Sequence, residues 1–159
     1  MTIEKEEATG ALVARLAAAR RGERGALLPL LHGIQKELGR VDGEAVAAIA
    51  EALNLSRAEV HGVVSFYHDF RDAPVGRHHV QFCRAESCQA RGGAAIEQAL
   101  VERLDVGMGE TRADGQVTLE PIYCLGLCAI GPNALVDGVP VARIDGRDAI
   151  DRVAATVAA

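Results

Sequence analysis

The chain has 159 residues, of which 49% are hydrophobic and only 3% aromatic, so it has enough apolar residues to form a folded core. Its net charge of −5 argues against nucleic acids and anionic membrane surfaces as main partners, because both attract basic proteins. No apolar run approaches the roughly 18 residues of a transmembrane helix, and the acidic start, MTIEKEEATG, lacks the layout of a signal peptide. The sequence therefore predicts a cytoplasmic protein with no membrane partner.

The first half, residues 1–72, predicts a helical region that docks on a partner protein. Apolar residues recur at helical spacing in two successive segments, and Gly39 is typical of the residue that ends the second helix. Asp42 indicates the start of a third helix. Ser56 and Glu59 have the spacing of a capping box and open a fourth. The apolar stripe expected on this fourth helix comprises Val60, Val63, Val64 and Tyr67.

A break at residues 71–76 separates this region from an α/β domain predicted over residues 77–159, since it contains aspartate, proline and glycine. The dipeptide Asp137-Gly138 is a strong signal for a two-residue hairpin turn. The expected elements are strand 78–83, helix 91–104, strand 116–123, strands 133–136 and 139–144, and a last helix capped by Asp145. This β-α-β-β-β-α order predicts a parallel pair of strands followed by a terminal hairpin.

All four cysteines lie in the second half, as two pairs. Four residues separate Cys83 from Cys88, three separate Cys124 from Cys128, and 35 lie between the pairs. Because Cys83 ends one predicted strand and Cys124 follows another, we expect both pairs in loops at the same edge of the sheet. A [2Fe–2S] cluster takes four thiolates, two on each iron, so this arrangement favours an iron–sulfur site.

Other interpretations of the cysteines stay open. A structural zinc site also takes paired cysteines with two to four intervening residues, so spacing alone does not exclude it. Free or paired thiols are a further alternative. A thioredoxin-type dithiol enzyme is disfavoured because the sequence contains no Cys-x-x-Cys motif.

Residues 47–66 also have the helix–turn–helix pattern of a DNA-binding motif. Charge argues against that function, because residues 41–70 contain only one basic residue, Arg57. The acidic residues of the same segment are Asp42, Glu44, Glu51, Glu59 and Asp69. We therefore interpret the segment as a helical hairpin that offers a face to a protein partner.

Longer motifs around the cysteines resemble a known family. The stretch with CRAESC and YCLGLCAIGPNALVDG is similar to the thioredoxin-like [2Fe–2S] ferredoxins, which include the small flavin-neighbouring subunit of respiratory complex I. The segments ALLPLLHGIQKELGRVD and ALNLSRAEVHGVVSFYHDF precede these motifs in the order that the family uses. Through HGVVSFYHDF and YCLGLC, the similarity is strongest to gamma subunits of cytosolic NAD-dependent, molybdenum-containing formate dehydrogenases. The resemblance covers about residues 25–145.

The resemblance implies a thioredoxin-like ferredoxin domain behind the helical region. It implies that Cys83, Cys88, Cys124 and Cys128 ligate one [2Fe–2S] cluster beside a flavin. It also implies a beta-type partner with FMN, an NAD site and an iron–sulfur cluster, and an alpha-type partner with a molybdenum cofactor. Equivalent subunits of NAD-linked hydrogenases and complex I are the alternative. The chain has no dinucleotide-binding motif and no nucleophile–base pair, so we expect electron transfer and no turnover by this chain alone.

Overall fold

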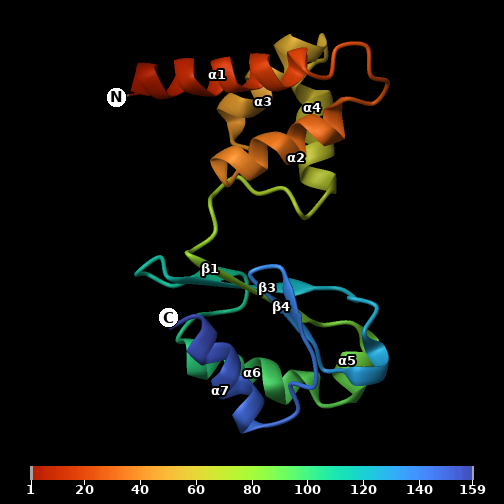
Figure 1. The fold of residues 1–159 in the computed structure, drawn as a ribbon, viewed down its shortest axis with the longest axis vertical. Helices are drawn as coiled ribbons and strands as arrows, with labels where there is room; N and C mark the ends of the chain where they lie inside the picture. The colour runs from red at the N-terminus through yellow and green to blue at the C-terminus, as the bar shows by residue number, and fades with distance from the viewer. Residues whose placement is uncertain (1, 159) are drawn as a thin grey trace. The chain divides into compact units, whose positions relative to one another are not determined.

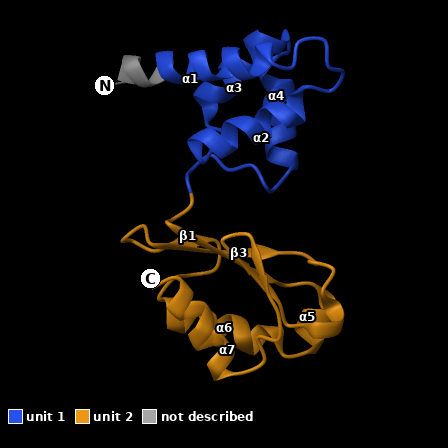
Figure 2. Ribbon diagram, viewed as in Figure 1, with its two compact units in different colours: residues 1–74 blue, residues 75–159 orange. Residues whose placement is uncertain are grey.

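The computed structural model describes residues 2–158, with side chains from residue 7 onward. The chain divides into two compact units, Met1–Pro74 and Val75–Ala159, shown in blue and orange in Figure 2. Each unit has its own hydrophobic core. Within the described residues, no helix is both long enough and apolar enough to cross a membrane.

Four helices build the described part of the first unit (Figure 1). They are α1 (Thr2–Ala18), α2 (Leu27–Leu38), α3 (Gly43–Leu53) and α4 (Arg57–Phe66). Their apolar faces meet in a core that includes Val13, Leu30, Leu31, Ile34, Ile49 and Val60. Burying one such side chain is worth roughly 1.5–3 kcal/mol, so this unit has a core of its own to hold the helices together. The predicted helical region is confirmed.

Local signals set the ends of these helices as expected. Gly39 follows α2 with a left-handed backbone, φ 74°, which glycine adopts at little cost. The Asp42 carboxylate accepts a hydrogen bond from the Ala45 N–H at 3.1 Å and so caps α3. At the start of α4, the Ser56 hydroxyl accepts from the Glu59 N–H at 3.2 Å, and the Glu59 carboxylate accepts from the Ser56 N–H at 2.8 Å. This reciprocal pair is the predicted capping box.

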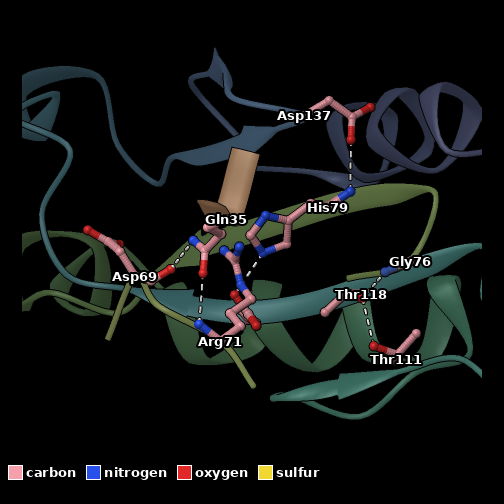
Figure 3. Close-up of polar contacts among 9 residues, drawn as sticks. Gln35, Asp69, Arg71, Gly76, His79, Thr111, Thr118 and Asp137 are labelled. Carbon is pink, nitrogen blue, oxygen red and sulfur yellow. Dashed lines mark hydrogen bonds and ion pairs between the residues drawn. The ribbon is translucent and has the colours of Figure 1, made fainter. Parts of the chain in front are cut away.

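The segment after α4 is fastened to α2 by the side chain of Gln35. Its Nε2 donates to the Asp69 carbonyl at 2.6 Å, and its Oε1 accepts from the Arg71 N–H at 2.9 Å (Figure 3). Tyr67, expected in the buried stripe of α4, is 41% exposed beside Phe66, which is 72% exposed. That expectation was wrong because the helix ends at Phe66 and the Tyr67 backbone is extended.

The second unit is a mixed five-stranded sheet with α6 and α7 on one face (Figure 1). The strands are β1 (His78–Cys83), β2 (Glu110–Thr111), β3 (Val117–Ile122), β4 (Ala134–Val136) and β5 (Val139–Val141). The helices are α5 (Glu86–Ala90), α6 (Gly93–Leu104), α7 (Arg147–Thr156) and the short 3-10 helix η1 (Cys128–Ile130). The strand order is β2-β3-β1-β4-β5, and β1 pairs in parallel with β3 and antiparallel with β4. The predicted parallel pair and terminal hairpin are both present.

Alternate side chains of the central strands form the core of this unit. Val80 and Phe82 of β1, with Val117 and Leu119 of β3, are fully buried in the cluster that includes apolar residues of α6 and α7. This period of two is what a sheet with one covered face requires. The core therefore holds the ends of β1 and β3 in a fixed register, on which the cysteine positions depend.

The hairpin between β4 and β5 turns at Asp137-Gly138, as predicted. Both residues have positive φ, 51° and 79°, which suits a tight hairpin turn. The Asp137 carboxylate accepts from the His79 N–H at 2.8 Å (Figure 3) and lies 2.8 Å from the His78 ring nitrogen Nδ1. The turn is thereby attached to the start of β1.

Four details of this unit differ from the expectations. The one-turn helix α5 and the two-residue strand β2 are too short to produce a periodic pattern, so neither was predicted. The last strand ends at Val141, because Arg143 has a left-handed backbone and its N–H bonds to the Ile130 carbonyl. Asp145 does not cap α7: the residue before the helix is Gly146, and no side chain bonds to the helix start there.

Candidate metal centre

The two cysteine pairs follow β1 and β3 at the same edge of the sheet. These strands run parallel, and Cys83, the last residue of β1, is in register with Ile122, the last residue of β3. Cys124 follows Ile122 by two residues. The parallel pairing therefore brings together two segments that are about 40 residues apart in the chain.

Cys88 lies in the short helix α5, not in a loop as expected. Cys83 and Cys88 are 2% and 1% exposed, and their side chains are hydrogen-bonded to each other. Gly93, at the start of α6, packs directly on this helix: a Cβ there would lie 2.7 Å from the Cys88 carbonyl oxygen. The first pair is therefore a buried unit that α5 and α6 hold against the end of β1.

The second pair lies in a tight and more exposed turn. Cys124 and Gly126 both have left-handed backbones, with φ of 64° and 76°. The Sγ atoms of Cys124 and Cys128 are 3.7 Å apart. Two thiolates on one tetrahedral metal ion, with bonds of about 2.3 Å, lie at about this separation. The hydrogen bond to Cys124, and then the charge of that sulfur, raise the pKa of the Cys128 thiol.

Backbone N–H groups surround the Cys83 sulfur. Burial acts to raise the pKa of the Cys83 thiol, but the N–H groups of Ala85, Cys124 and Leu125 donate to it and lower the pKa overall. The left-handed conformation of Cys124 lets consecutive N–H groups converge on one atom, an arrangement that binds anions. Burial, and then the hydrogen bond to Cys83, raise the pKa of the Cys88 thiol. Cys83 is thus prepared to carry negative charge.

Asn133 is a site residue that the sequence analysis missed. It is 1% exposed, and its Nδ2 donates to the Leu127 carbonyl at 2.8 Å, within the second cysteine turn. The same nitrogen lies 4.0 Å from Cys88 Sγ, and the Asn133 carbonyl accepts from the Cys83 N–H at 2.9 Å. The available signal was a polar residue at the head of the apolar stretch NALV, directly after Gly131-Pro132.

The chemistry of these donors suits a two-iron cluster. Among the described residues, no group of three or more His, Cys, Asp or Glu side chains is placed to hold a metal ion. The thiols instead form two pairs, one buried and one more exposed. A [2Fe–2S] cluster takes two thiolates on each iron, and hydrogen bonds to the sulfurs adjust its reduction potential. Four cysteines in two pairs, with N–H donors on one sulfur, fit that group.

Comparison with known proteins agrees with this chemistry. The family model of the thioredoxin-like [2Fe-2S] ferredoxins matches residues 13–157. The chain belongs to this family. It is 39% identical over 114 residues to a subunit of the NADH-quinone oxidoreductase of Escherichia coli (strain K12), covering 72% of this chain and 69% of that protein. It is 35% identical over 119 residues to NADH-quinone oxidoreductase subunit 2 of Thermus thermophilus, covering 75% of this chain and 66% of that protein.

Solved structures support the same assignment. The crystal structure of an NAD+-reducing [NiFe]-hydrogenase in the H2-reduced state matches with a TM-score of 0.70 and 27% identity. The match covers 83% of this chain and 22% of that hydrogenase chain, so this chain spans less than a quarter of it. The predicted thioredoxin-like fold of this ferredoxin family, preceded by a helical region, is confirmed.

Proposed function

We propose that this chain is an electron-transfer subunit that holds one [2Fe–2S] cluster on Cys83, Cys88, Cys124 and Cys128. The observation that carries the proposal is the meeting of two cysteine pairs at one sheet edge, with backbone N–H groups on the Cys83 sulfur. Membership of the ferredoxin family supports the choice of cluster over zinc. The chain itself offers ligands and hydrogen-bond donors, which suits a carrier of electrons within a larger enzyme.

When bound, such a cluster accepts and releases one electron at a time, at about −400 mV in all-cysteine plant-type ferredoxins. The protein residues have separate tasks around it. Cys83 and Cys88 are buried, so they keep water from one side of the site. Cys124 is exposed, and its neighbour Tyr123 is 69% exposed, which leaves the other side open to a partner. We propose that electrons enter or leave across this exposed turn.

The partner that we propose is a subunit with FMN and an NAD site. Flavins exchange an electron pair with NAD and single electrons with iron–sulfur centres, so a one-electron carrier is useful beside them. The related proteins named above are an NADH-quinone oxidoreductase and an NAD+-reducing hydrogenase, which supports NAD-linked chemistry. We also propose that the chain works in the cytoplasm, as the sequence predicts.

For the parent complex, we propose an NAD-dependent formate dehydrogenase with a molybdenum-containing alpha-type subunit. The segments HGVVSFYHDF and YCLGLC support this choice by their resemblance to gamma subunits of such enzymes. An NADH-quinone oxidoreductase or an NAD+-reducing hydrogenase is the second candidate, and identities of 39% and 27% to their subunits favour it. The electron-transfer role that we propose for this chain is the same in each of these three candidate complexes.

The proposed cluster is tested by EPR spectroscopy of the anaerobically purified chain, before and after reduction with dithionite. We expect an oxidised sample without a signal, and a reduced sample with a spin-one-half signal whose average g value lies below that of the free electron. Metal analysis of the same sample gives the iron and zinc contents. A colourless protein with stoichiometric zinc and no signal in either state would contradict the proposal and support a structural zinc site.

A further inference from the structure

Asn133 contacts three separate parts of the candidate cluster site. Its backbone carbonyl accepts from the Cys83 N–H at the end of β1, at 2.9 Å. Its side-chain Nδ2 donates to the Leu127 carbonyl at 2.8 Å, inside the turn that carries the second cysteine pair. The same Nδ2 lies 4.0 Å from Cys88 Sγ, and the Asn133 backbone N–H also donates to that sulfur. One buried residue therefore joins the segments of both pairs.

The partners of the Asn133 amide fix its orientation. A reversed amide would place its oxygen against the Leu127 carbonyl oxygen, and two acceptors do not bond, so the NH2 group must face Leu127 and Cys88. Oδ1 of Asn133 is buried and has no hydrogen-bond partner among the described residues.

A donor beside a ligand sulfur affects the redox balance of the site. Reduction adds negative charge, which the metal-bound sulfurs share, and hydrogen bonds to charged acceptors are stronger than those to neutral ones. Two N–H groups of Asn133 directed at Cys88 therefore favour the reduced state and raise the reduction potential.

We propose that Asn133 is a positioning residue for the cluster: its amide holds the turn at Leu127 against Cys88 and raises the reduction potential through the contact with the Cys88 sulfur. This inference rests on the proposed function. The backbone N–H at residue 133 is present in any variant, so substitutions isolate the contribution of the side chain.

The test is an EPR-monitored redox titration of the cluster-loaded full chain in Asn133→Leu and Asn133→Ala. Leucine has a similar shape but no donor, and alanine adds no atoms that could clash. We expect a more negative midpoint potential in both variants.

Thr118→Val is the matched control. Thr118 is 3% exposed near the opposite end of β3, where it accepts from the Gly76 N–H at 2.7 Å and bonds to Thr111 at 2.7 Å (Figure 3). This variant loses buried hydrogen bonds of the same unit without touching a cysteine, and we expect an unchanged midpoint potential.

An unchanged or more positive midpoint potential in both Asn133 variants, with the cluster present, would overturn the inference. Folded Asn133 variants that fail to retain the cluster, while Thr118→Val retains it, would support the positioning role. Only the Asn133 variants lose the hydrogen bond to Leu127 that joins the two cysteine segments. A wild-type chain without the reduced EPR signal would instead contradict the proposed function itself. The two failures are therefore distinguishable.

Discussion

The four cysteine sulfurs lie in unequal surroundings. Burial and then its contact with Cys83 raise the pKa of the Cys88 thiol, whereas N–H donors overcome burial at Cys83 and lower the pKa there. Cys124 is exposed on a left-handed turn. The buried pair is therefore held by packing and hydrogen bonds, and the more exposed pair by the backbone of its turn and by the Asn133 amide. Substitutions that disturb packing are expected to act on the buried pair first.

Gly93→Ala tests the packing behind Cys88. A Cβ at this position would lie 2.7 Å from the Cys88 carbonyl oxygen and 3.0 Å from its carbonyl carbon, so α5 would have to move. We expect a loss of about 1–3 kcal/mol in the free energy of unfolding, the usual cost of overpacking, and weaker retention of the cluster. Urea denaturation and iron content measure the two effects.

Gly62→Ala is the control for this substitution, because a Cβ at that position in α4 meets nothing within 4 Å. Removing a glycine from a helix interior stabilises by roughly 0.5–1 kcal/mol, and iron content should not change. Normal iron content and stability in Gly93→Ala would show that α5 moves freely, contrary to this close packing.

The cysteine positions could be predicted from the sequence, but their neighbours could not. Cys83 ends one predicted strand and Cys124 follows another, and parallel strands end at one edge of a sheet, so their meeting follows from local patterns. Asn133 and Gly93 act through contacts to residues distant in sequence or to backbone atoms, and no periodic pattern marks such contacts. The choice between iron and zinc required the longer family motifs around the cysteines.

At the scale of helices and strands, the elements that were predicted well carry their own local signals. The capping box of α4 and the Asp137-Gly138 turn each depend on side chains within a few residues. Asp145 shows the limit of such signals, because an acidic residue before a helix resembles a cap while Gly146 takes the capping position. Tyr67 shows another limit: its apolar spacing continues past the point at which the helix ends.

The capping box predicts a pH dependence of stability. Hydrogen bonds from the backbone N–H and then the hydroxyl of Ser56 hold the pKa of the Glu59 carboxyl below its ordinary value of 4.5. A pKa that is lower in the folded state gives stabilisation that is fully present above pH 4.5 and is lost as the pH falls through the lowered value. We therefore expect wild type to exceed Glu59→Gln in stability at neutral pH, with the difference shrinking in acid. Urea denaturation of both proteins across this range measures it, and a difference independent of pH would refute the assignment.

At the scale of the whole chain, we assign the proposed cluster binding and the proposed partner docking to two units with separate cores. The second unit contains all four cysteines, whereas the first exposes the aromatic side chains of Phe66 and Tyr67 at the end of α4. Large exposed aromatic groups are common in protein interfaces, so we propose that these two side chains take part in the predicted docking of residues 1–72 on a partner. The fold does not distinguish between candidate partners, because related folds occur in several NAD-linked complexes. The choice of partner therefore depends on sequence motifs.

Cys124→Ser in the assembled complex tests the position of the cluster in the electron path. We expect loss of the EPR signal of this cluster, with NADH oxidation at the flavin of the proposed partner less affected, because in our proposal hydride transfer takes place on that subunit. NAD+ reduction with formate by the wild-type complex checks the proposed parent complex. Activity with hydrogen or quinone instead of formate would favour the second candidate.

Ala129→Ser is the matched control, since Ala129 is exposed just beyond the same turn and is not a thiol. It should keep both the signal and the activity. If Cys124→Ser abolished flavin activity while the complex stayed assembled, the proposed role beside the flavin would be wrong.

The position of β1 in the sheet also dictates when the site can form during biosynthesis. β1 lies between β3 and β4, so its neighbours are made only after about 40 to 55 further residues. At about 5–20 residues per second, the thiols of Cys83 and Cys88 wait on the order of several seconds before Cys124, Cys128 and Asn133 leave the ribosome. Thiols are open to oxidation during that interval. If these four cysteines are the ligands, as we propose, delivery of iron and sulfide must follow synthesis through Cys128, because an earlier supply would meet only half of the proposed ligands.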